Sequence, residues 1–231
     1  MLGELNSARF WFDLLQIIGI NILLSGDNAV VIALASRSLP ASQRKMAVLG
    51  GSGAAVVLRI ALCLIVASLL QVRYLKLVGG LLLLYIGIKL IVEEESNDEI
   101  AARSNMWGAI RTILIADAVM SLDNVVAIAA AAHDSVLLIA LGLLISIPLI
   151  VFGSQLMLKV LHRYPILVML GGGLLGWIAG EIIVSDPVLH GHLPFDEELV
   201  TRIAKPLLAI GVMLAGTALA RRAAAADTAE P

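Results

Sequence analysis

The chain has 231 residues, of which 60% are hydrophobic and 15% are charged, and its formal net charge at neutral pH is −2. Soluble domains are about 45–50% apolar and about 25% charged, so this composition argues against a soluble protein. The charge offers no basic surface for nucleic acid, and a single cysteine cannot form an internal disulfide. Apolar runs spread over the whole length predict an all-α polytopic membrane protein.

The apolar runs predict one transmembrane domain of about seven helices, with no cleavable signal peptide before the first. The expected spans are residues 14–36, 46–70, 75–92, 109–132, 135–158, 166–185 and 203–220. We interpret the polar segment from Ser185 to Arg202, which contains Asp186, as a solvated loop. The tail at residues 223–231 is predicted to be disordered.

The first span carries a polar motif near its middle. At about 1.5 Å per residue it is roughly 30–35 Å long, about the thickness of the hydrocarbon core. Asp27 therefore falls near mid-membrane, where a carboxylate costs at least about 3 kcal/mol and is kept mainly for function. Asn21, Ser25 and Asn28 share one stripe of an ideal helix, and Asp27 lies about 100° from Asn28.

The fourth span repeats this motif 96 residues later. Ser121, Asp123 and Asn124 correspond to the serine, aspartate and asparagine of the first copy, and Asp117 lies on the same stripe as Ser121. For aspartate and asparagine to reach one ligand, each helix should loosen locally. We therefore predict an irregularity near Ser25-Gly26, where glycine weakens the helix, and a second near Ser121-Leu122.

The motifs belong to a longer internal repeat. Paired glycines in the third and sixth spans align at an offset of 92, so residues 14–92 form one repeat and residues 109–185 the other. Three spans is an odd number, so the two copies should cross the membrane in opposite directions, as inverted repeats of secondary transporters do. The helix at 203–220 stands outside the repeat. Glycines at every fourth position, Gly172, Gly176 and Gly180, predict close packing within a protomer or in a homo-oligomer.

The motif side chains offer oxygen atoms, which suit Mg²⁺, Ca²⁺ or Mn²⁺ rather than zinc or copper. The candidate metal-binding residues are Asn21, Ser25, Asp27, Asn28, Asp117, Ser121, Asp123 and Asn124. An alternative is that these residues hold helices together through interhelical hydrogen bonds.

Two further charges lie within the predicted spans. Arg59, near the middle of the second span, needs a carboxylate or a wet cavity. It would either compensate the aspartates when the site is empty or form a fixed structural ion pair. Glu181 lies toward one end of the sixth span, where it would be a gate, a proton site or an interfacial residue.

Basic residues indicate the orientation. Ten of the sixteen lysines and arginines fall on the side of the C-terminus, five fall on the side of the N-terminus, and one lies inside a span. Because cytoplasmic loops carry the excess of basic residues, we expect the N-terminus outside and the C-terminus in the cytoplasm.

The sequences LLSGDNA around Asp27 and MSLDNV around Asp123 resemble those of the TerC family of integral membrane proteins, related to the LysE transporter superfamily. The resemblance covers nearly the whole chain. It implies metal-ion export with manganese as the leading substrate, and an association with tellurite resistance. Family members commonly carry an acidic residue six positions before each motif aspartate; this chain has Asp117 in the second copy but Asn21 in the first.

Our hypothesis is a divalent cation exporter in a bacterial inner membrane, with Mn²⁺ as substrate and no resident cofactor or enzyme activity. Proton antiport is a further hypothesis, with Asp27, Asp117 and Asp123 as proton carriers. Two alternatives remain. One is a non-transporting metal sensor or partner in a resistance complex, and the other is an intramembrane aspartyl protease, which also needs two membrane aspartates.

Overall fold

The computed structural model describes residues 8–69, 72–95, 106–132, 135–189 and 196–227. Within these ranges the chain forms α-helices and no β-strand, which confirms the predicted all-α class. The helices are α1 (Ala8–Leu24), α2 (Gly26–Ser36), α3 (Ala41–Leu69), α4 (Leu75–Glu95), α5 (Met106–Ala132), α6 (Val136–Arg163), α7 (Ile166–Val184) and α8 (Glu197–Asp227).

The number of membrane spans agrees with the prediction. In the described part of the chain, α3 to α8 are each long and apolar enough to cross a membrane, and α1 and α2, bent by 52° at their break, make a seventh if the pair is one span. The last helix differs from its prediction. α8 extends beyond 203–220 at both ends and continues through residues 223–227, the first part of the expected tail. Residues 228–231 lie outside the described residues.

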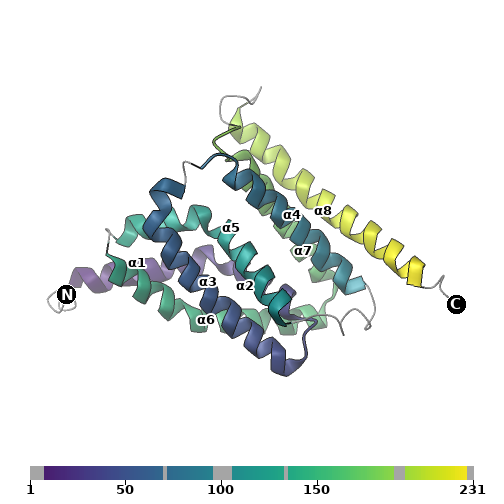
Figure 1. Ribbon diagram of the computed structural model, residues 1–231, viewed down its shortest axis with the longest axis horizontal. Helices are drawn as coiled ribbons and strands as arrows, with labels where there is room; N and C mark the ends of the chain where they lie inside the picture. Colours follow the sequence, from purple (N-terminus) through teal and green to yellow (C-terminus); the bar gives the residue numbers. More distant parts are fainter. Residues whose placement is uncertain (1–7, 70–71, 96–105, 133–134, 190–195, 228–231) are drawn as a thin grey trace.

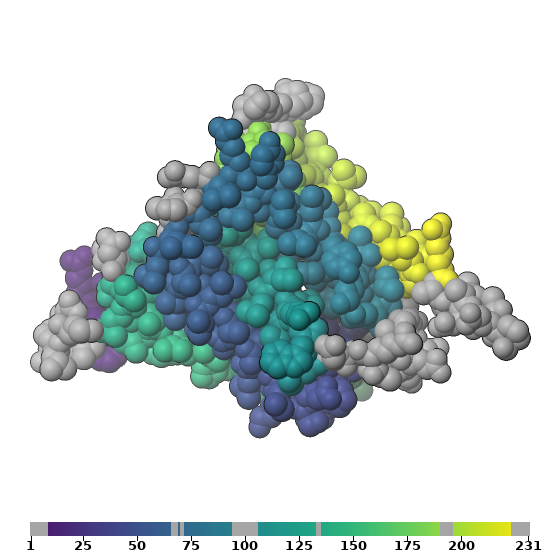
Figure 2. All heavy atoms as spheres, viewed as in Figure 1, coloured from purple at the N-terminus to yellow at the C-terminus, as the bar shows by residue number. Residues whose placement is uncertain are grey.

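The helices form two groups. α4, α7 and α8 run side by side, and we call them the three-helix group (Figure 1). The five-helix group consists of α1, α2, α3, α5 and α6, which pack mainly on one another. The groups meet chiefly where α4 contacts α5 and where α2 contacts α7. Figure 2 shows α5, in teal, on the same face as α3 and α4.

Glycines bring the helices of the three-helix group close together. A Cβ atom on Gly87 of α4 would lie 3.0 Å from the carbonyl oxygen of Gly172 on α7. A Cβ on Gly176 would lie 2.5 Å from the carbonyl oxygen of Leu208, and one on Gly180 would lie 2.9 Å from backbone atoms of Lys205. The predicted glycine packing is therefore made within one chain, against α4 and α8.

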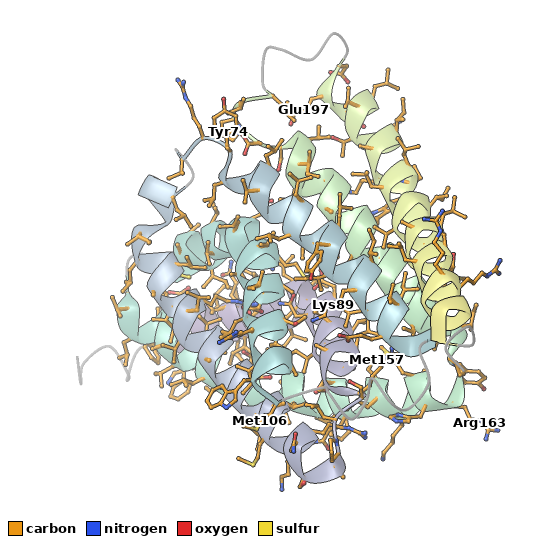
Figure 3. All side chains as sticks on the ribbon, turned by 45° about the vertical axis from the view of Figure 1, so that its right-hand side comes forward. Tyr74, Lys89, Met106, Met157, Arg163 and Glu197 are labelled. Atoms are coloured by element: carbon orange, nitrogen blue, oxygen red, sulfur yellow. The ribbon has the colours of Figure 1, made fainter. Side chains whose placement is uncertain are left out.

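The helix ends gather at two opposite ends of the molecule. Figure 3 shows Tyr74 and Glu197, which precede or begin α4 and α8, at one end, and Met106 and Arg163, which begin α5 and end α6, at the other. The predicted spans imply this arrangement, since the loops before α4 and α8 should lie on one side of the membrane and those before α5 and after α6 on the other. The inverted relation between the two repeats stays a prediction.

Asp186, which follows α7, joins the two repeats at the Tyr74 end of the molecule. The side chain is fully buried, so the solvated-loop interpretation is wrong for this residue. Its carboxylate accepts hydrogen bonds from the backbone amides of Tyr74 (3.3 Å), Leu77 (2.9 Å) and Val188 (2.9 Å). Tyr74 has a φ of 65°, a left-handed conformation that this contact helps to hold. Asp186 thus caps the start of α4, where unpaired amides need an acceptor.

Candidate functional site

The first motif lies at a break between two helices. α1 ends at Leu24 and α2 begins at Gly26, with Ser25 between them at φ −112° and ψ 9°. The backbone bonds across the break are long, 3.4 Å from Ser25 N to the carbonyl oxygen of Ile22 and 3.3 Å from Ala29 N to that of Ser25. The predicted irregularity is confirmed here. It places Asp27 in the first turn of α2, where the helix dipole favours a carboxylate.

The second motif lies in an unbroken helix. α5 runs from Met106 to Ala132, so the predicted irregularity near Ser121-Leu122 is wrong. Leucine occupies the position that Gly26 has in the first copy, and leucine stabilises a helix that glycine weakens. The two motifs touch at the break, where the Asn124 side chain donates a hydrogen bond of 3.1 Å to the carbonyl oxygen of Leu24. The second motif therefore satisfies a backbone group at the end of α1.

Arg59 of α3 is the centre of a buried polar cluster. Its side chain is 2% exposed. One terminal nitrogen donates a hydrogen bond to the amide oxygen of Asn21 and another, of 2.9 Å, to the hydroxyl of Ser25. The other lies 2.5 Å from the carboxylate of Asp117 on α5. We predicted that Arg59 would have either a carboxylate or a wet cavity, and the structure shows the carboxylate, that of Asp117.

Asp117 connects the two motif copies. One carboxylate oxygen, which faces Arg59, also accepts a hydrogen bond of 3.0 Å from the side-chain amide of Asn28. The other accepts one of 3.3 Å from the hydroxyl of Ser121. The amide oxygen of Asn28 and the Nε of Arg59 are buried and have no hydrogen-bond partner among the described residues. The cluster therefore keeps one free oxygen ligand beside its carboxylate.

Sequence reasoning missed one member of this cluster. Asn21 donates from its side-chain nitrogen to the hydroxyl of Ser146, which lies on α6 and is fully buried. Ser146 in turn donates to the carbonyl oxygen of Leu143 at 2.7 Å. A lone serine in an apolar span is a weak signal, because its hydroxyl can bond to its own helix. Its place two residues before Pro148 was the only available hint.

The two motif aspartates lie outside the cluster. Asp27 is half-buried, and one of its oxygens accepts a 2.8 Å hydrogen bond from the backbone amide of Asn28. Asp123 has a side chain that is 51% exposed and forms an ion pair of 2.6 Å with Lys76 of α4. Lys76 also donates to the hydroxyl of Ser185 at 3.3 Å.

Glu181 is also separate from the cluster. Its carboxylate forms an ion pair of 2.5 Å with Lys205 of α8, whose ammonium lies 5.6 Å from the centre of the Trp177 ring. This ion pair joins α7 to α8 next to the close contact that Gly180 makes with Lys205. It supports the interfacial interpretation of Glu181 more than a role beside the motifs.

The oxygen atoms of the cluster surround an internal cation. In the described residues, no three histidine, cysteine, aspartate or glutamate side chains come together in a way that could hold a metal ion. The oxygens of Asn21, Ser25 and Asp117 instead converge on the guanidinium of Arg59. A divalent ion that used these oxygens would have to displace this guanidinium.

Comparison with known proteins agrees with this architecture. The family model described as "Integral membrane protein TerC family" matches residues 6–226. The uncharacterized membrane protein YjbE of Bacillus subtilis is 44% identical over 180 residues, which cover 78% of this chain and 83% of YjbE. The inner membrane protein YgdQ of Escherichia coli K12 is 25% identical over 78% of this chain and 83% of its own length. No solved structure matches. This chain is an integral membrane protein and belongs to the TerC family.

Proposed function

We propose that this protein exports a divalent cation, with Mn²⁺ as the leading substrate. The observation that carries the proposal is the guanidinium of Arg59 enclosed by the oxygens of Asn21, Ser25 and Asp117. A site that holds an internal cation in this way is built for positive charge. Oxygen ligands of this kind suit hard divalent ions such as Mn²⁺.

The broken helix supports a transport role. Discontinuous helices near mid-membrane are how many secondary transporters expose backbone carbonyls and helix ends to an ion. Here the break at Ser25 lies beside Asp27 and next to the free amide oxygen of Asn28. In the loaded state, Asp27 and Asp123 would join these oxygens and Arg59 would move aside.

The proposed setting is a bacterial inner membrane, with the N-terminus outside and the C-terminus in the cytoplasm. Moving two positive charges outward against about 100 mV, inside negative, costs roughly 4–5 kcal/mol. Proton antiport would supply this energy, with Asp27, Asp117 and Asp123 as proton carriers. If collapsing the pH gradient leaves Mn²⁺ transport unchanged, proton antiport is wrong.

The test is Mn²⁺ uptake into inside-out vesicles by wild type and by Asp27→Asn and Asp123→Asn variants at equal expression. We expect each variant to lose at least about tenfold in rate, since a lost ionic ligand costs a few kcal/mol in a low-dielectric site. Asp13→Asn is the matched control, because Asp13 lies on α1 and pairs with Arg9, away from the cluster.

Other outcomes would favour the alternatives. Purified wild-type protein in liposomes that moves neither Mn²⁺, Ca²⁺ nor Mg²⁺ would overturn the export proposal and support a sensor or partner in a resistance complex. Cleavage of a membrane peptide that disappears in Asp27→Asn would point to an aspartyl protease.

A further inference from the structure

A second polar region lies at the other end of the molecule from Tyr74, between the start of α3 and the end of α6. A cavity of about 730 Å³ opens there. Its lining residues are Ala41, Arg44, Lys45, Val48, Gln155, Leu158, Lys159 and His162. None of these residues belongs to the buried cluster around Arg59, so the cavity is a separate site.

The cavity has an apolar floor and a basic rim. Val48 and Leu158 are buried, whereas Lys45, Lys159 and His162 are exposed. Across the described residues, no carboxylate forms an ion pair with Arg44, Lys45 or Lys159. The Nε of Arg44 is buried and finds no hydrogen-bond acceptor within the same part of the chain. The rim therefore presents positive charge that no carboxylate of the described residues neutralises.

The cavity lies at the ends of two helices that could each cross a membrane. α3 and α6 both have the length and hydropathy of membrane spans, and the lining residues come from the first turns of one and the last turns of the other. Figure 3 shows Arg163, which ends α6, at this end of the molecule. Basic pockets between transmembrane helices at the membrane surface suit anionic headgroups, and the apolar floor suits the upper part of an acyl chain.

We propose that this cavity binds one anionic phospholipid, with its phosphate between Lys45 and Lys159, beside Arg44. Arg44 also connects the cavity to α2, the helix that begins with the first motif. The Nη2 of Arg44 donates hydrogen bonds of 2.9 Å to the carbonyl oxygens of Arg37 and Leu39, just beyond the end of α2. A bound lipid would therefore fix the side chain that holds the end of α2. This inference does not depend on the transported ion.

The test is native mass spectrometry of the full-length protein with phosphatidylglycerol or phosphatidylcholine of the same acyl chains. Wild type should retain phosphatidylglycerol preferentially, and Lys45→Gln/Lys159→Gln should lower its apparent affinity about tenfold, because two basic residues are lost. The control Arg163→Gln/Arg222→Gln removes the same charge from positions that do not line the cavity, and it should lower the affinity less than twofold.

A thermal measurement keeps the test decisive if the variant folds poorly. Phosphatidylglycerol should raise the unfolding midpoint of wild type and control, but not that of Lys45→Gln/Lys159→Gln. Equal retention of the two lipids by wild type, or an equal loss in control and cavity variant, would overturn the proposal. Displacement of the lipid by excess inorganic phosphate would show that the site takes a soluble anion instead.

Discussion

Arg59 of α3 and Asp117 of α5 form an ion pair inside the helix bundle, with 2.5 Å between Nη2 and Oδ1 and exposed fractions of 2% and 8% for the two side chains. The pair is enclosed by amide and hydroxyl groups from both motif copies. A buried pair of this kind contributes little net stability relative to apolar residues, but removing one partner leaves an uncompensated charge. The stability of the protein should therefore depend strongly on whether one partner or both partners are replaced.

Arg59→Met should lower the free energy of unfolding by about 3–5 kcal/mol, because Asp117 is left buried without its counter-charge. Adding Asp117→Leu to the same chain should recover part of the loss. The measurement is denaturant titration in micelles. Arg9→Met is the control, since Arg9 is exposed, and it should change stability by less than about 0.5 kcal/mol. A double variant no more stable than Arg59→Met would contradict this account of the pair.

Lys76→Gln should lower the apparent KM for Mn²⁺ if Asp123 binds the ion. The lysine competes for this carboxylate, and a partly exposed pair contributes about 0.2–1 kcal/mol, so the change should be up to about fivefold. Transport at graded Mn²⁺ concentrations measures it. Lys89→Gln lies on the same helix, pairs with Glu93 and serves as the control. An unchanged KM would mean that Lys76 does not compete with the ion.

Gly176→Ala should destabilise the contact between α7 and α8 by about 1–3 kcal/mol, because its Cβ would lie 2.5 Å from the carbonyl oxygen of Leu208. The matched control is Gly211→Ala on α8, where a Cβ meets no atom within 4 Å. The control should be neutral or more stable by up to about 1 kcal/mol, since alanine favours helix. Thermal unfolding of both variants checks the difference. Equal behaviour of the two would contradict the close packing.

Stability should fall in acid because of Asp186. Burial alone would raise its pKa, but hydrogen bonds from the backbone amides of Val188, Leu77, Tyr74 and Lys76 hold the pKa below the usual value. The folded state thus favours the ionised form. Its contribution is present at neutral pH and is lost as the pH falls below about 4, through the lowered pKa.

The variant Asp186→Asn isolates this effect. Wild type should have a higher unfolding midpoint than the variant at pH 6, and the difference should shrink as the pH falls below about 4. Unfolding midpoints at graded pH measure the two curves. A difference that stays constant with pH would show that the Asp186 carboxylate does not contribute through its charge.

The sequence was sufficient for the spans and for the break in the first one. Apolar length predicts each span, and the Ser25-Gly26 pair predicts the break, because both depend on local properties of the chain. Helical geometry also grouped Asn21 with Ser25, and their side chains are indeed hydrogen bonded at 3.2 Å. The need of Arg59 for a carboxylate follows from the cost of burying charge.

The partners across helices could not be predicted in the same way. Which carboxylate meets Arg59, and that Asp123 meets Lys76, depends on how each helix is rotated about its axis, which a single sequence does not specify. Asp123 has the same position in its motif as Asp27, yet its surroundings differ because α5 is unbroken. Likewise, Asp186 resembled a loop residue until the start of α4 was seen to lie against it.

Because the helices form two groups, the buried Arg59 and the partly buried Lys76 make different kinds of contact. Arg59 and all its hydrogen-bond partners belong to the five-helix group or to the break within it, so sliding one group past the other would leave these contacts unchanged. The Lys76–Asp123 pair instead spans the boundary between the groups, and the same sliding would stretch or break it. Arg59 thus holds helices together within one group, whereas Lys76 joins one group to the other.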